Sequence, residues 1–187
     1  MKIMMRKIAL PLTLLGAAML APPLQAADGS INVTGRVTES SCVLDASSKN
    51  QTVIWGKTEA VVPKMVLAYS RSIYVQLADC PDSIDQVKVR FEGTQANTQQ
   101  LSGNVFAIDN SDQPDAAENV GFIISNAQGK NGGFWNDLLR VNEFSPAIEL
   151  NKREVNKLEF RTGYSTDNKM PTAGVARTRI QFSLIYP

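Results

Sequence analysis

The sequence contains no histidine, and this absence excludes much of the chemistry on which enzymes depend. Without an imidazole there is no Ser-His-Asp or Cys-His centre, no histidine metal ligand and no side chain suited to proton transfer near neutral pH. Paired carboxylates would remain a route to hydrolysis, but no such pair is evident. The acidic run 109–118 lacks the glycine and closing glutamate of a calcium loop. We therefore expect no enzyme, no catalytic residue, no metal site and no cofactor.

Long apolar runs are also scarce, and the one that exists lies at the start of the chain. Three basic residues precede the apolar run 8–20, and the small residue Ala26 follows it. A membrane-spanning helix needs about 20 apolar residues, and this run is shorter and contains a proline. It predicts a secretory signal peptide over residues 1–26. No second run follows, so we expect an exported chain without direct membrane insertion.

Charge of one sign is not in excess. The formal net charge is +1, and removing a leader with three basic and no acidic residues leaves −2. A nearly neutral surface argues against nucleic acid or an anionic membrane as the main partner.

Cysteine is limited to Cys42 and Cys80. In an exported protein, an even pair is most simply one disulfide. A reactive thiol would need a setting that lowers its pKa, and the chain has neither a Cys-x-x-Cys motif nor a histidine. We expect the disulfide.

Short alternating segments separated by turn residues make up most of the chain after residue 26, and no helical periodicity is sustained there. At least seven strands with this spacing predict an all-β fold, an antiparallel two-sheet sandwich of immunoglobulin type. The expected strands include residues 42–44, 51–55, 72–77, 86–92, 121–125, 147–150 and 157–164.

The stretch 174–187 is predicted to be an unusually long terminal strand. From residue 180 onward its apolar side chains alternate with polar ones, which is typical of a strand with one buried face. A long apolar edge left open invites pairing with another chain. We therefore expect a groove that another strand fills, lined by Ile180, Phe182, Leu184 and Tyr186.

Residues 27–41 alternate in the same way before the first cysteine. They could be an ordinary first strand of the sandwich, or a detachable strand that fills a groove in a neighbour. In the second interpretation Ile31, Val33 and Val37 are the buried side chains, and Gly35 lies where the neighbour leaves no room for one. A chain with a groove at one end and a spare strand at the other is suited to head-to-tail polymerisation.

Several motifs together carry a family resemblance. Val33-x-Gly35-x-Val37 precedes Cys42, and Ile73-x-Val75-x-Leu77-x-x-Cys80 leads to the second cysteine. Gly121-Phe122-Ile123-Ile124 follows, Gly174 stands fourteen residues from the C terminus by inclusive count, and Tyr186 is penultimate. In these motifs the chain resembles subunits of the chaperone–usher fimbriae (type 1 and P-like pili) of Gram-negative bacteria. The short segment before Cys42 is similar to minor, adaptor-like subunits, and major rod subunits fit nearly as well.

The resemblance implies an incomplete immunoglobulin-like sandwich that lacks its last strand and is completed in trans by a donor strand. It implies three partners: a periplasmic pilus chaperone, an outer-membrane usher and neighbouring pilin subunits. It also implies export to the periplasm, assembly in a fimbrium on the cell surface, and three segments: signal peptide 1–26, donor-strand extension 27–41 and pilin domain 42–187. By carry-over the donor strand comprises Ile31, Val33, Gly35 and Val37, the disulfide is Cys42–Cys80, and the groove and chaperone-binding strand comprises Gly174, Ile180, Phe182, Leu184 and Tyr186.

Two alternatives remain open. One is a fimbrial adhesin module that binds carbohydrate, although a separate receptor-binding domain would need a longer chain. The other is a periplasmic enzyme that uses carboxylates, which would require two acids with perturbed pKa values in one cleft.

Overall fold

The computed structural model describes residues 41–55, 70–98, 101–129, 134–152, 154–166 and 169–187. All of these belong to one compact unit, Thr38–Pro187. The expected signal peptide and the expected donor residues Ile31, Val33, Gly35 and Val37 lie outside the described residues, and their roles remain predictions.

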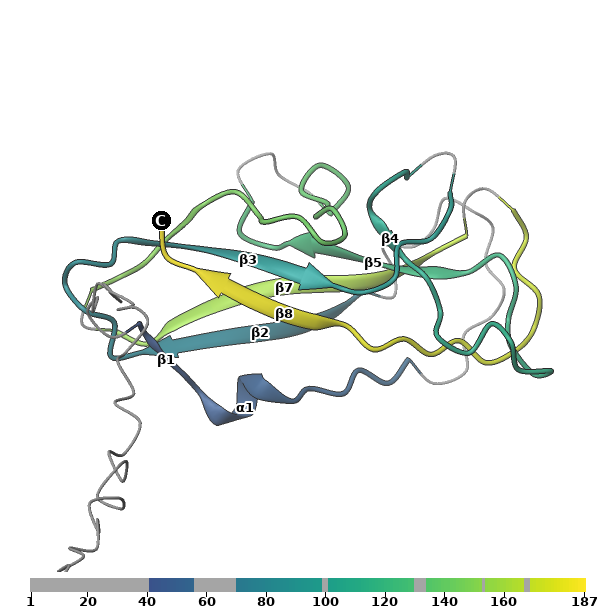
Figure 1. Cartoon of the computed structure of the whole chain (residues 1–187), viewed down its shortest axis with the longest axis horizontal. Coiled ribbons are helices and arrows are strands. Elements are labelled where there is room, and N and C mark those ends of the chain that lie inside the picture. Colours follow the sequence, from purple (N-terminus) through teal and green to yellow (C-terminus); the bar gives the residue numbers. More distant parts are fainter. Residues whose placement is uncertain (1–40, 56–69, 99–100, 130–133, 153, 167–168) are drawn as a thin grey trace, which may run out of the picture. The chain divides into compact units, whose positions relative to one another are not determined.

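The described residues form a two-sheet antiparallel structure with one helical turn (Figure 1). The first sheet has the strand order β1-β2-β7-β5-β4, and the second has the order β6-β3-β8. The elements are β1 (Val43–Leu44), α1 (Ala46–Lys49), β2 (Arg71–Ala78), β3 (Gln86–Glu92), β4 (Val105–Phe106), β5 (Gly121–Asn126), β6 (Ile148–Glu149), β7 (Asn156–Ser165) and β8 (Gln181–Ile185).

The core lies between the two sheets and follows the alternation in the sequence. In β3 the residues Val87, Val89 and Phe91 are buried while the residues between them are half-buried. The Phe91 ring meets the Phe160 ring of β7 edge to face, with 5.0 Å between centroids. Aromatic pairs at this separation pack favourably beyond the area they bury. The two sheets are therefore joined by a continuous apolar interior.

Strand β5 is buried along its whole length, as its apolar sequence predicts. Phe122 and Ile124 belong to the main core between the sheets. Ile123 points the other way into a second cluster with Val105 and Phe134. A strand covered on both faces has no polar side to present, which explains why its sequence does not alternate.

The topology matches an immunoglobulin sandwich, in which strands A, B, E and D form one sheet and C, F and G the other. Strands β1, β2, β7 and β5 occupy positions A, B, E and D, and β3 and β8 occupy positions C and F. Within the described ranges no strand occupies position G beside β8. The predicted all-β sandwich is confirmed.

The terminal strand is shorter than the sequence indicated, a second expected strand is absent, and one observed strand was not predicted. The terminal strand covers only Gln181–Ile185, because the chain before it is held by a loop instead of a strand. Residues 51–55 form no strand, because the Gln51 side chain takes the place of main-chain pairing. The two-residue strand β4 lies in a stretch that showed no clear alternation.

Candidate strand-binding groove

A groove of about 820 Å³ follows one side of β8 and separates it from the segment that leads out of β1. Its two walls therefore come from different sheets. The second sheet contributes β8 together with Glu92 at the end of β3, and the first sheet contributes the segment 44–52. The lining residues are Leu44, Lys49, Asn50, Gln51 and Thr52 on one wall and Glu92, Arg179, Ile180, Gln181, Phe182, Ser183 and Leu184 on the other.

The inward-facing side chains of β8 are only partly covered. Ile180, Phe182, Leu184 and Tyr186 all pack against the main core, yet none of them is fully buried. The Phe182 ring lies 6.4 Å from the Phe91 ring, centroid to centroid, so β8 is in contact with the interior. Apolar area that remains exposed on such a strand is available for burial by another chain. The structure thus brings together three of the four alternating residues predicted to line a groove, Ile180, Phe182 and Leu184, while Tyr186 and Gly174 are not among its lining residues.

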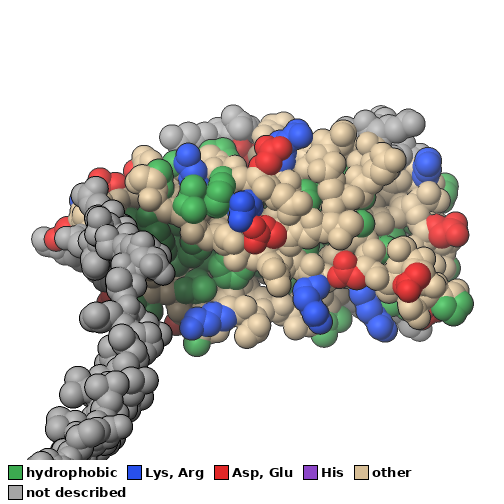
Figure 2. Space-filling model, in the orientation of Figure 1, with side chains coloured by type: hydrophobic (Ala, Val, Ile, Leu, Met, Phe, Trp, Pro, Cys, Tyr) green, Lys and Arg blue, Asp and Glu red, His purple; other side chains and the backbone are tan. Residues whose placement is uncertain are grey.

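The outward-facing residues of β8 are Gln181, Ser183 and Ile185, of which Ile185 is an exposed apolar residue. Ser183 donates a hydrogen bond to Glu92 (2.9 Å), which also pairs with Arg90 of the same strand. On the face viewed in Figure 2, acidic and basic side chains are interspersed, and hydrophobic side chains gather in the left half, where β8 ends in Figure 1. The groove lining is mixed: the apolar Leu44, Ile180, Phe182 and Leu184 lie among polar and charged side chains that include Lys49, Glu92 and Arg179.

Partial burial also affects the titration of Tyr186. Removal from water disfavours the charged phenolate, so the pKa of Tyr186 is raised above its ordinary value. This phenol stays neutral at all physiological pH values.

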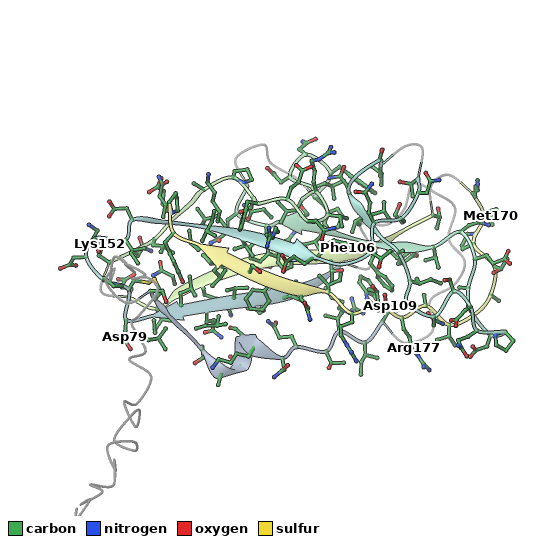
Figure 3. The ribbon with its side chains drawn as sticks, in the orientation of Figure 1. Asp79, Phe106, Asp109, Lys152, Met170 and Arg177 are labelled. Carbon is green, nitrogen blue, oxygen red and sulfur yellow. A yellow bond between two sulfur atoms is a disulfide. The ribbon has the colours of Figure 1, made fainter. Side chains whose placement is uncertain are left out.

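A loop before β5 fixes the start of β8. The main-chain N–H groups of Arg177 and Arg179 donate to the side chains of Asn110 (2.9 Å) and Asp109 (2.6 Å). The N–H of Asp109 in turn donates to the carbonyl of Arg177 (2.7 Å). Figure 3 places Asp109 and Arg177 together, at the end of the sandwich opposite Asp79 and Lys152. The acidic run is therefore a structural support for β8 as well as a surface loop.

Gly174 is required where the chain enters this region. A Cβ atom built on Gly174 would lie 2.5 Å from the main-chain N of Ala117 and 2.6 Å from the carbonyl carbon of Ala116. Val175 forms a parallel bridge to Ala116 directly beside it. Only glycine permits two backbones to approach this closely. The close packing of these two backbones therefore explains why a glycine stands at position 174 of the terminal segment.

The second wall is anchored by the predicted disulfide. Cys42 and Cys80 are bonded, with 4.1 Å between their Cα atoms, so the residue before β1 is tied to the residues that follow β2. After β1, Asp45 caps the turn α1 by accepting from the N–H of Ser47 (2.8 Å). These hydrogen bonds from the hydroxyl and N–H of Ser47 lower the pKa of the Asp45 carboxyl.

None of the lining residues of this wall was predicted as a site residue: Leu44, Lys49, Asn50, Gln51 and Thr52. Leu44 belongs to an expected strand, so its half-buried position could have been found from the alternation. Gln51 and Thr52 were expected in the strand 51–55, but the position of Gln51 depends on its side-chain contact with β2, which is distant in sequence.

The described part of the chain contains no group of three or more cysteine, aspartate or glutamate residues arranged to hold a metal ion. No helix within it has the length and apolar character needed to cross a membrane. What the groove can do chemically is accept an extended chain along β8.

Comparison with known proteins places these observations in a family context. The probable major fimbrial subunit LpfA of Escherichia coli O157:H7 is 26% identical over 100% of this chain and 99% of its own length. Long polar fimbria protein A of Salmonella typhimurium is 24% identical, over 100% of this chain and 99% of its own. A type-1 fimbrial protein subunit of Serratia marcescens is 25% identical, over 97% of this chain and 99% of its own. A comparison with protein-family models finds no match.

Solved structures with the same fold include pilus subunits. A chaperone–usher pilus structure covers 89% of this chain and 100% of its own, with 15% identity and a TM-score of 0.60. The P pilus rod subunit PapA covers 79% of this chain and 100% of its own, with 14% identity and a TM-score of 0.59. The predicted resemblance is confirmed: the chain is similar to fimbrial subunits over its whole length and shares the incomplete immunoglobulin-like fold of chaperone–usher pilins.

Proposed function

We propose that the chain is a structural subunit of a chaperone–usher fimbria that polymerises by donor-strand exchange and so supports bacterial adhesion. The observation that carries the proposal is the open groove beside β8, at the position where an immunoglobulin sandwich has its last strand. The similarity to fimbrial subunits along the full length supports it.

The proposed occupant in the fibre is the segment 27–41 of a neighbouring copy or of a related subunit. Its proposed donor residues 31, 33, 35 and 37 lie at every second position, as do the groove-lining residues Ile180, Phe182 and Leu184. Because the side-chain period of a strand is two, such a match fixes the register of an added strand. Main-chain pairing along β8 would supply affinity, and the apolar contacts would supply specificity.

Before assembly, the same groove would be covered by a periplasmic chaperone. An edge strand with half-exposed Phe182 and Leu184 is prone to pair with other chains. A chaperone strand would protect it until an outer-membrane usher exchanges that strand for the next subunit's extension. The chain would thus pass from the periplasm, after loss of residues 1–26, into a fimbrium on the cell surface.

Head-to-tail assembly is tested with two complementary variants of the mature chain 27–187. Val33→Lys places a charge among the proposed donor residues and leaves the groove intact. Leu184→Lys places a charge in the groove and leaves the donor intact. Each variant alone is expected to stay monomeric, and an equimolar mixture is expected to stop at a one-to-one dimer, while the unchanged chain forms a ladder of polymers.

The matched control is Asn32→Lys, which puts the same charge on the opposite face of the proposed donor strand and should still polymerise. Size-exclusion chromatography with light scattering distinguishes these species. Polymers formed by Val33→Lys alone, or the absence of any dimer in the mixture, would contradict donor-strand exchange.

A further inference from the structure

The edge of β2 continues well beyond the two residues that pair with β1, and side chains cover it. The amide of Gln51 reaches Tyr74 of β2 with both of its groups. Its Nε2 donates to the carbonyl of Tyr74 (2.6 Å), and its Oε1 accepts from the N–H of the same residue (3.0 Å). A strand residue paired with a neighbouring strand exchanges the same two hydrogen bonds. One side chain thus takes the place of a strand.

The next edge residue of β2 is satisfied in a similar way. The N–H of Gln76 donates to the hydroxyl of Ser48 (2.9 Å), and the carbonyl of Gln76 accepts from the N–H of Asp45 (3.0 Å). Ser48 is only 2% exposed, so its hydroxyl is an enclosed acceptor. Two successive edge positions are therefore closed mainly by side chains of the segment 45–51.

Part of the main chain beyond Gln51 has no partner among the described residues. Because the contact with β2 is made by a side chain, none of the described residues forms a hydrogen bond with the main chain of Thr52, Val53 or Ile54. Thr52 lines the groove opposite β8. Within the described ranges the groove is thus bordered by an unpaired edge of β8 on one side and, at Thr52, by main chain without a hydrogen-bond partner on the other.

Other contacts hold the two ends of the wall. The disulfide and β1 fix its start. At the far end the Trp55 ring packs edge to face with the Tyr164 ring, with 6.0 Å between their centroids. The guanidinium carbon of Arg71 lies 5.6 Å from the centroid of the same Trp55 ring. Gln51 is the contact in the middle, beside the groove, so its loss would free the wall there without detaching the ends.

We propose that Gln51 is a positioning residue for strand binding: its amide fixes the second wall at the distance from β8 at which an inserted strand can pair with both sides. The inference rests on the proposed function, because the occupant is the donor strand. Gln51 is itself exposed, so replacing it does not open a cavity in the core.

The test uses the full mature chain, oxidised, and a fluorescent synthetic peptide with the sequence of residues 27–41. Fluorescence anisotropy gives the apparent Kd at a temperature well below the melting transition. Gln51→Leu removes both hydrogen bonds to Tyr74, and we expect the apparent Kd to rise about tenfold. Every chain in the series also carries Val33→Lys, which disables its own segment 27–41 as a donor, so that the groove stays open to the peptide.

The matched control is Gln128→Leu, which makes the same exchange at an exposed position outside the groove, where no hydrogen bond to β2 is lost. Its apparent Kd should change less than about twofold. A purely structural role of Gln51 would lower the melting temperature and leave the low-temperature Kd unchanged. Hydrogen exchange at the Tyr74 amide, which the Gln51 side chain covers, should accelerate in Gln51→Leu only.

The outcomes separate this inference from the proposed function. If the chain with Gln51 fails to bind the peptide, donor-strand binding itself is contradicted. If the chain with Gln51 binds and Gln51→Leu binds equally well, or if Gln128→Leu weakens binding as much, the positioning role is overturned. Should Gln51→Leu lose its fold, Gln51→Glu provides the comparison, because it keeps the acceptor for Tyr74 and loses the donor.

Discussion

Strands β3 and β8 are neighbours in one sheet, and the same alternation of apolar and polar residues runs through both. Their inward residues even lie opposite one another, with Val89 paired to Leu184 and Phe91 to Phe182. Yet Val89 is 0% and Phe91 4% exposed, whereas Phe182 and Leu184 remain half-buried. Equivalent sequence patterns on the same face of the same sheet thus reach different degrees of burial.

The difference lies in the neighbours. Strand β3 has β6 on one side and β8 on the other, while β8 has a strand on one side only among the residues that the structure describes. The incomplete burial of β8 therefore reflects a vacant strand position, since its inward side chains are as apolar as those of β3. We infer that burial along β8 is completed by another chain.

Truncating the two paired phenylalanines should show most strongly the difference in burial between β3 and β8. Phe91→Ala removes a ring from the interior and should destabilise the chain by about 3–5 kcal/mol. Phe182→Ala removes a ring that is still partly in water, and in the chain with an open groove it should cost about half as much. Urea denaturation of both variants measures the free energies of unfolding. Equal losses of unfolding free energy would contradict the partial exposure of Phe182 in β8.

Removing the disulfide tests the anchor of the opposite wall. Cys42→Ala together with Cys80→Ala releases a cross-link between residues 38 positions apart. On the chain-entropy model this should lower the free energy of unfolding by about 3–4 kcal/mol. Chemical denaturation with and without the substitutions measures the loss. No change in the midpoint would show that the wall is held without the cross-link.

Gly174→Ala tests the support at the start of β8. The new methyl group would meet the backbone of Ala116 and Ala117, which cannot move aside as a flexible side chain can, so we expect a loss of about 1–3 kcal/mol. The control is Gly93→Ala, where the nearest atom, at 3.0 Å, belongs to the side chain of Phe106. Thermal melts should rank Gly174→Ala as the more damaging. The reverse ranking would contradict the crowding argument.

The smallest effect should be the pH dependence that Tyr186 contributes. Its pKa is raised by burial in the folded chain, so folded Tyr186 keeps its proton at a pH where an unfolded tyrosine, with a pKa of about 10, loses it. Its contribution to stability is complete below about pH 10 and is lost as the pH rises towards the folded pKa. Urea midpoints between about pH 9 and 11 should fall less steeply for Tyr186→Phe. Identical slopes would contradict the burial of this phenol.

The parts of the fold that the sequence predicted are those governed by local periodicity. The expected strands 72–77, 86–92 and 157–164 correspond to β2, β3 and β7, because their alternation is long and ends at clear turn residues. The alternating lining residues Ile180, Phe182 and Leu184 were predictable for the same reason. Cys42 and Cys80 could pair in only one way.

The second wall of the groove could not be predicted, because distant contacts determine it. Residues 51–55 have strand-like composition. The Gln51 side chain nevertheless takes the place of main-chain pairing by hydrogen-bonding Tyr74, 23 positions away, and no local sequence pattern indicates this contact. The shortening of the terminal strand has a similar cause, since Asp109 and Asn110 hold its first residues from a loop.

The most direct test of a vacant strand position is a thermal melt of two oxidised chains. The first comprises residues 42–187 alone, and the second carries residues 27–41 joined to its C terminus by a flexible linker. If the groove lacks a strand, the second chain should be a monomer that melts cooperatively, on the order of 10 °C or more above the first. If the first chain is already a stable monomer and the added strand leaves its melting temperature unchanged, the account is contradicted.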